Sequence, residues 1–92
     1  MRYVLLGSIN AAAIAKQKQR TQAARARLKK LGIQLQSINY TQGVYDFVDI
    51  VEAPNAEAVL AFSIWYARQG FGKITTMPAF DEKAMLAAIK LG

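Results

Sequence analysis

The sequence contains no cysteine, no histidine and only two prolines. Without cysteine and histidine the chain cannot form disulfide bonds, thiolate nucleophiles, imidazole general bases or the usual zinc sites. Long apolar runs are missing too, because the longest, 58–67, is interrupted by Ser63 and is too short to span a bilayer. We therefore expect a cytoplasmic protein with no membrane partner and no bound metal.

Acidic residues are absent from the first half of the chain. Residues 1–45 carry eight basic residues and no acid, whereas 46–92 carry four basic and six acidic residues, for a net charge of +6. Such a basic half attracts nucleic acid, or the acidic half of a second copy. The basic residues of 11–31 flank an apolar stripe, with Lys16, Arg20, Arg27 and Lys30 on one side and Lys18, Arg25 and Lys29 on the other. Because no aromatic residue accompanies them, this pattern favours a solvated helix over a nucleic-acid surface.

The order of the predicted elements indicates one α+β domain over residues 1–92. Runs rich in β-branched and aromatic residues predict strands at 3–6, 33–41, 44–51 and 71–78, the middle two forming a hairpin. Helix-forming residues predict helices at 11–31, 56–69 and 82–90, with Asn55 and Asp81 as N-caps of the last two. This order is the ferredoxin-like βαββαβ arrangement with an extra C-terminal helix, in which an antiparallel sheet carries helices on one face.

Both faces of the two central strands are apolar, although a sheet with one bare face normally alternates apolar and polar residues. At 44–51, Val44, Val48 and Ile50 alternate with Tyr45, Phe47 and Val51, and at 3–6, Tyr3 and Leu5 alternate with Val4 and Leu6. We therefore expect a second copy to cover the bare face, so that the sheets pair into a dimeric α+β barrel with an apolar and aromatic interior. A monomer with an apolar surface is the alternative.

The helix at 56–69 is apolar on too many sides for a simple surface helix. Its spacing predicts an inner face of Ala56, Val59, Leu60, Ser63 and Ala67, with Trp65 opposite and Phe62 nearby. Packing against a partner or the terminal helix explains Trp65 more simply than ligand stacking does.

Asp49 is the carboxylate of most chemical interest. It shares a strand face with Tyr45 and Phe47, so in the space between paired sheets burial would raise its pKa and make it a general base. A structural ion pair with a residue such as Arg2 is the alternative. By contrast, Asp46 is expected to accept backbone hydrogen bonds beside the turn.

The residues around the hairpin resemble the signature of the GYD domain family. The likeness lies in Gly43-Val44-Tyr45-Asp46, in Val48 and in Ile50-Val51-Glu52-Ala53-Pro54. It extends to Tyr3-Val4-Leu5-Leu6 in the first strand and to Leu31-Gly32 before the hairpin. The resemblance implies a small bacterial or archaeal ferredoxin-like domain of the dimeric α/β-barrel type, with no established biochemical activity.

Three functional interpretations remain open. The first is a homodimer or higher oligomer that binds or senses a small molecule between paired sheets, with Tyr3, Tyr45, Phe47 and Asp49 as ligand-binding residues. The second is a cofactor-independent enzyme, similar to a monooxygenase or an isomerase, in which Asp49 and Tyr45 are catalytic. The third is a basic nucleic-acid accessory protein. Haem is bound through histidine, cysteine or tyrosine, and only tyrosine is present, so we expect no haem and no other cofactor.

Overall fold

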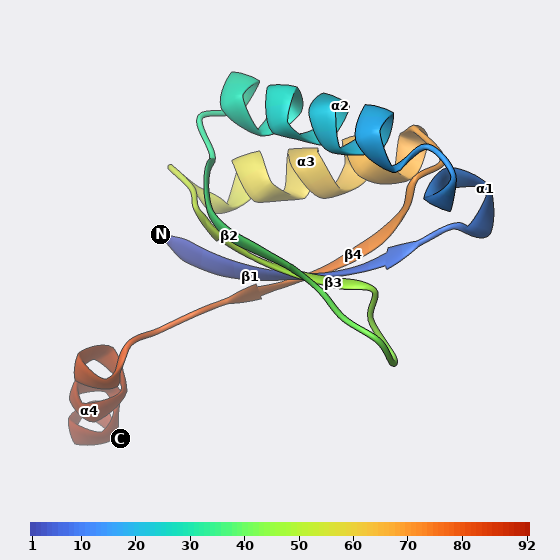
Figure 1. The fold of residues 1–92 in the computed structure, drawn as a ribbon. Coiled ribbons are helices and arrows are strands. Elements are labelled where there is room, and N and C mark those ends of the chain that lie inside the picture. Colours follow the sequence, from blue (N-terminus) through green and yellow to red (C-terminus); the bar gives the residue numbers. More distant parts are fainter.

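Four strands and four helices make up the chain in the computed structural model, which describes residues 1–92 (Figure 1). The strands are β1 (Arg2–Ile9), β2 (Gln34–Tyr40), β3 (Phe47–Glu52) and β4 (Gly72–Pro78). The helices are α1 (Ala11–Ile14), α2 (Gln17–Lys30), α3 (Ala56–Arg68) and α4 (Glu82–Leu91). Both predicted N-caps are confirmed, because Asn55 Oδ1 accepts from the Ala58 amide at 2.9 Å and Asp81 Oδ1 accepts from the Ala84 amide at 2.8 Å.

The strands form one antiparallel sheet in the order β2-β3-β1-β4, and α2 and α3 lie side by side on one of its faces (Figure 1). This is the ferredoxin-like fold that the element order predicts. The helix-covered face buries alternate residues of the two central strands, namely Tyr3, Leu5, Phe47, Asp49 and Val51. In β2, the pairing with β3 shifts between Leu35 and Ser37, where one residue is extra.

The helix predicted at 11–31 is interrupted at Ala15 and Lys16, so it forms the short α1 and the longer α2. Lys16 departs from helical geometry, with φ −105° and ψ 34°. The carbonyl oxygen of Ala13 accepts hydrogen bonds from the Arg20 guanidinium at 2.9 Å and from the Lys16 amide at 3.1 Å. A side chain that inserts into the backbone ladder in this way breaks a helix. The prediction of one continuous helix is therefore wrong, and Ile14, at the end of α1, is exposed.

α3 directs Val59, Phe62 and Tyr66 into the core. The predicted inner face shares only Val59 with this set, and Leu60 is exposed. Aromatic rings bury more apolar area than alanine or serine, so the rings decide how the helix is rotated about its axis. Trp65 stacks on Phe62 with 5.7 Å between ring centres, which agrees with a packing role but within the same chain.

β3 begins at Phe47 rather than at Val44, because residues 41–46 form a turn. Val44 and Tyr45 therefore do not alternate with the strand residues, and Val44 is exposed. The Asp46 carboxylate accepts a hydrogen bond from the Ile9 amide at 2.7 Å, which ties the turn to the end of β1. The expected role of Asp46 as an acceptor of backbone hydrogen bonds is confirmed.

Gly7 lies inside β1 instead of ending it. The ring of Phe47 covers Gly7, and a Cβ atom at this position would lie 1.9 Å from the ring. Only glycine leaves that space free. Gly7 therefore determines where the Phe47 ring lies beneath the helices.

The second face of the sheet carries no helix (Figure 1). Its central strands present the half-buried side chains of Val4, Leu6, Val48 and Ile50, and β4 adds the exposed Met77. We call these five residues the open face. Its apolar character matches the prediction from sequence.

α4 stands apart from the rest of the domain, beyond the segment that follows β4 (Figure 1). Its Met85, Leu86 and Ile89 side chains are exposed. The radius of gyration, 14.3 Å, accordingly exceeds the value of about 12 Å that is typical of a compact chain of this length. None of the four helices is both long and apolar enough to span a bilayer.

Candidate functional site

A cavity lies between the helix layer and the sheet, where α2 and α3 meet β2 and β3. The cavity is small, with a volume of about 40 Å³, and it opens to solvent on one side. The apolar part of the lining consists of Ala24, Leu28, Leu35, Ile38, Phe47 and Phe62, and the polar part of Arg20, Thr21, Arg25, Tyr40, Asp49 and Tyr66. The cavity therefore combines apolar walls with several ionisable groups, as small-molecule binding sites do.

Asp49 lies in the middle of β3, paired with Leu5 on β1 and with Ile38 on β2. Its side chain is 6% exposed, and its Oδ1 atom has no hydrogen-bond partner. Burial raises the pKa of Asp49 to about 7, and the positive charge of Arg25 acts in the opposite direction. Because desolvation disfavours the charged carboxylate, Asp49 can gain and lose a proton near neutral pH.

Tyr66 reaches the cavity from α3. Its side chain is 3% exposed, and its hydroxyl has no hydrogen-bond partner. Burial raises the pKa of Tyr66 to about 12. Arg20 lowers it through its charge and as a neighbouring donor, although the two groups lack the geometry of a hydrogen bond, and the charges of Asp49 and Tyr40 raise it. The ring packs edge-on against Phe47 and Phe71, so the hydroxyl is held by a rigid aromatic cluster.

Arg20 on α2 is 4% exposed, although the charge pattern predicts a solvated position for it. Its guanidinium donates to the Ala13 carbonyl oxygen and to Gln17 Oε1. Gln17 in turn donates to the Tyr40 hydroxyl at 2.7 Å. These contacts join α1, α2 and β2 at one end of the cavity. Neither Arg20 nor Tyr66 is among the site residues predicted from sequence.

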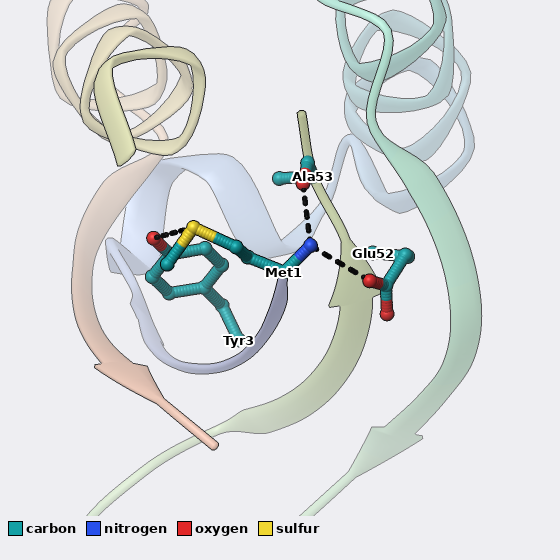
Figure 2. A network of polar contacts seen from close by, with 4 residues as sticks. All are labelled: Met1, Tyr3, Glu52 and Ala53. Atoms are coloured by element: carbon teal, nitrogen blue, oxygen red, sulfur yellow. Dashed lines mark hydrogen bonds and ion pairs between the residues drawn. The ribbon is translucent and has the colours of Figure 1, made fainter. Parts of the chain in front are cut away.

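The predicted ligand-binding residues are only partly brought together. Phe47 and Asp49 line the cavity, whereas Tyr3 and Tyr45 do not. The Tyr3 hydroxyl turns toward Met1 Sδ at a distance of 3.8 Å, beside the amino group of Met1, which contacts Glu52 and Ala53 (Figure 2). Tyr45 lies in the 41–46 turn, so it does not share a strand face with Asp49.

The predicted orientation of these residues is also wrong. Phe47, Asp49 and Tyr3 face the helices of their own subunit, not the space between two sheets. The alternation along β3 correctly places Phe47, Asp49 and Val51 on one face. Alternation alone cannot tell which face the helices cover when both faces are apolar.

Arg2, the ion-pair partner considered for Asp49, also lies elsewhere. It is exposed at the start of β1, opposite Glu52. Asp49 therefore has no ion pair with Arg2, and its carboxyl group remains available to the cavity.

The chain was compared with curated protein sequences, with solved structures and with models of protein families. No functionally curated protein is detectably similar in sequence. The structure is similar to that of 5-chloro-2-hydroxyhydroquinone dehydrochlorinase from Burkholderia phenoliruptrix, determined in complex with 2,5-dihydroxybenzoquinone. The TM-score is 0.64 at 16% identity, over 91% of this chain and 98% of the dehydrochlorinase. At this identity the likeness establishes the fold alone. The family model of the GYD domain matches residues 3–89, nearly the whole chain, and the protein therefore belongs to the GYD domain family.

Proposed function

We propose that the protein binds a small, single-ring organic compound in the cavity between α2, α3 and the sheet. The observation that carries this proposal is the pair of buried polar atoms, Asp49 Oδ1 and the Tyr66 hydroxyl, without hydrogen-bond partners. Buried polar groups in folded proteins nearly always have such partners. Two unpartnered groups in one cavity therefore indicate a bound ligand that supplies the missing hydrogen bonds.

The chemistry of the cavity supports a flat ring with polar substituents. The rings of Phe47 and Phe62 and the side chain of Leu28 provide apolar walls. Asp49 and Tyr66 provide an acceptor and a donor between them. The dehydrochlorinase of the same fold holds 2,5-dihydroxybenzoquinone, a compound of this kind. We therefore take this compound as the first probe.

The binding proposal is tested by filling the cavity. Ala24 on α2 lines the cavity, and its neighbour Ala23 does not, although both are half-buried. Calorimetric titration with 2,5-dihydroxybenzoquinone, hydroquinone and 2,5-dimethoxybenzoquinone should detect binding to the wild-type protein and to Ala23→Phe. Ala24→Phe should lose it. Absence of binding to the wild type by all three compounds, or unchanged binding to Ala24→Phe, would contradict the proposal.

Proton transfer to the bound ring is a second candidate function, favoured by the protonation behaviour of Asp49. A general acid–base group works best when its pKa lies near the working pH, and burial raises the pKa of Asp49 to about 7. Asp49 would deliver its proton to a ring carbon of a bound enolate and take a proton back from the same carbon. The two steps balance and need no cofactor. Tyr45, the other predicted catalytic residue, does not line the cavity and has no part in this scheme.

Hydrogen exchange measures this reaction directly. In deuterium oxide, the wild-type protein should accelerate loss of the ring C–H signal of 2,5-dihydroxybenzoquinone in proton NMR spectra. Asp49→Asn should still bind the compound and should lose the acceleration. Equal exchange rates with and without the wild-type protein would leave a binding function and remove the catalytic one.

We further propose that a second copy covers the open face. The face is apolar over both central strands, and α4 adds a second apolar surface that its own domain leaves uncovered. Monomers rarely expose contiguous apolar patches of this kind. Light scattering of the wild-type protein should give the mass of two chains or more, and Val48→Lys should reduce it to one. A wild-type mass of one chain would exclude this assembly.

A further inference from the structure

The charge on Arg20 has no counterpart in the protein. The side chain is 4% exposed, and its guanidinium donates only to neutral acceptors, the Ala13 carbonyl oxygen at 2.9 Å and Gln17 Oε1. The chain contains one ion pair, between the amino group of Met1 and Glu52, so no carboxylate pairs with Arg20. Arginine is almost never buried to this degree without an anionic partner, because removing its charge from water is costly.

The unpaired charge lies at the cavity wall beside a second unsatisfied group. Arg20 and Tyr66 both line the cavity, and the Tyr66 hydroxyl has no hydrogen-bond partner. Arg20 is also close enough to that hydroxyl to act on it as a neighbouring donor, which lowers the pKa of Tyr66 against the larger opposing effect of burial. A guanidinium only donates hydrogen bonds, and a neutral hydroxyl can donate one. An acceptor that lies between them can therefore receive hydrogen bonds from both.

The remaining charges around the cavity do not cancel this positive end. Arg25 also lines the cavity and is the group whose charge acts on Asp49. Asp49 is the only carboxylate in the lining, and burial favours its neutral form. The lining therefore holds two arginines and at most one negative charge.

We propose that the cavity selects an organic anion, such as a phenolate, an enolate or an ionised hydroxyquinone, whose charged oxygen binds between Arg20 and the Tyr66 hydroxyl. This inference rests on the proposed binding function and names the class of its ligand. The charged oxygen receives a charge-assisted hydrogen bond from Arg20, and the ring lies against Phe47 and Phe62. Asp49 remains free to meet a second substituent of the same ring.

Two probes of similar shape separate an anion site from a site for any ring. 2,5-Dihydroxybenzoquinone is a vinylogous acid that is ionised at neutral pH, and 2,5-dimethoxybenzoquinone is its neutral methylated counterpart. Calorimetric titration of the wild-type protein should show at least about tenfold tighter binding of the anion, which corresponds to about 1.4 kcal/mol. This comparison needs no variant and does not depend on how a substitution affects folding.

Substitution then assigns the preference to Arg20. Arg20→Gln should reduce affinity for the anion by about tenfold or more and leave affinity for the neutral compound unchanged. Arg20→Lys should retain part of the preference. Arg27→Gln is the matched control, because Arg27 lies on the same helix and does not line the cavity. It should bind both probes as the wild type does.

The outcomes distinguish this inference from the function on which it rests. Equal wild-type affinity for the two probes, or an undiminished preference in Arg20→Gln, overturns the anion site and leaves the binding function intact. Failure of the wild type to bind any of the probes overturns the binding function and, with it, the anion site.

Discussion

Each face of the sheet departs from the usual pattern of polarity. Beneath the helices, where a core is normally apolar, the protein buries Asp49, Arg20 and the Tyr66 hydroxyl. On the side without helices, where polar residues are normal, the central strands carry aliphatic side chains. Sequences ordinarily place polar groups in water and apolar groups in the core. Polar groups inside the core and apolar groups on the uncovered face both cost stability, and the proposed binding site and the proposed contact with a second copy would account for them.

Both departures are visible along β3. Its inward residues are Phe47, Asp49 and Val51, and its outward residues include Val48 and Ile50. A single strand thus contributes a polar group to the interior and an apolar stripe to the exterior. Substitutions on the two sides of this strand and its neighbours provide the sharpest comparison.

The largest effect is expected from the pH dependence contributed by Asp49. Burial raises its pKa from 3.8 to about 7 in the folded protein, so the native state binds the proton more tightly than the unfolded chain does. Its contribution to stability is fully present below about pH 4 and is lost as the pH rises through about 7, up to about 4 kcal/mol in all. Urea unfolding of Asp49→Asn should lack this decline, so that the variant is the more stable protein at about pH 8.

The other ionisable groups that line the cavity with Asp49 should not add a pH dependence of their own between about pH 4 and pH 8. Arg20 and Arg25 on α2, Tyr66 on α3 and Tyr40 on β2 line the same cavity. Arginine and tyrosine side chains ordinarily keep one charge state over this pH range. An unchanged pH profile in Asp49→Asn would show that Asp49 is not buried as a neutral acid.

The next largest effect is expected at Gly7, which lies against the Phe47 ring. Gly7→Ala places a Cβ atom 1.9 Å from that ring, so the ring must move and the inner face must repack. We expect a loss of about 3 kcal/mol in the free energy of unfolding, measured with urea. Ser8→Ala, the adjacent position on the opposite side of β1, is the matched control and should stay within about 0.5 kcal/mol of the wild type.

Matched valines compare the two faces directly. Val51 is fully buried under the helices, and Val48 lies on the open face of the same strand. Val51→Thr should cost about 2 kcal/mol, because it buries a hydroxyl group at constant shape. Val48→Thr should cost less than about 0.5 kcal/mol in a lone subunit, and more at protein concentrations where a second copy covers the face. If the loss in the free energy of unfolding of Val48→Thr does not depend on protein concentration, a second copy does not cover the open face.

The smallest effect is expected outside the cavity, at the edge of the helix layer. The guanidinium carbon of Arg27 lies 5.2 Å from the ring centre of Trp65, which is a cation–π contact between α2 and α3. Arg27→Gln should lower the free energy of unfolding by about 0.5–1 kcal/mol. Lys29→Gln, on the exposed side of α2, should change it by less. Equal effects of the two substitutions would show that the contact contributes nothing measurable.

The sequence alone predicts the element order, the helix N-caps and the ferredoxin-like fold, because these depend on local residue preferences and on connection rules. It also places Asp49 and Phe47 on one strand face. It cannot predict that the helices cover this face, because Val4, Val48 and Ile50 make the opposite face equally apolar. The choice between them depends on how the helices dock.

The place of Arg20 and Tyr66 in the candidate site could not be predicted from the sequence, for a different reason. Arg20 is one of several basic residues on a helix, and its bond to the Ala13 carbonyl oxygen accompanies a helix break at Lys16 that residue preferences do not predict. Tyr66 belongs to an aromatic run on α3 in which spacing alone does not single out one ring. The tertiary structure, rather than any motif, makes these residues a candidate site.

The extra residue in β2 decides what the cavity is made of. Because the pairing shifts between Leu35 and Ser37, Leu35 and Ile38 lie opposite Val51 and Asp49, on the helix side. An uninterrupted strand would turn Ser37 and Asn39 to that side, since a shift of one residue exchanges the two faces. Pairing Gln36 regularly would thus exchange a hydrophobic wall for a hydrophilic one, whereas deleting Gln36 would remove the irregularity and keep Leu35 and Ile38 on the helix side.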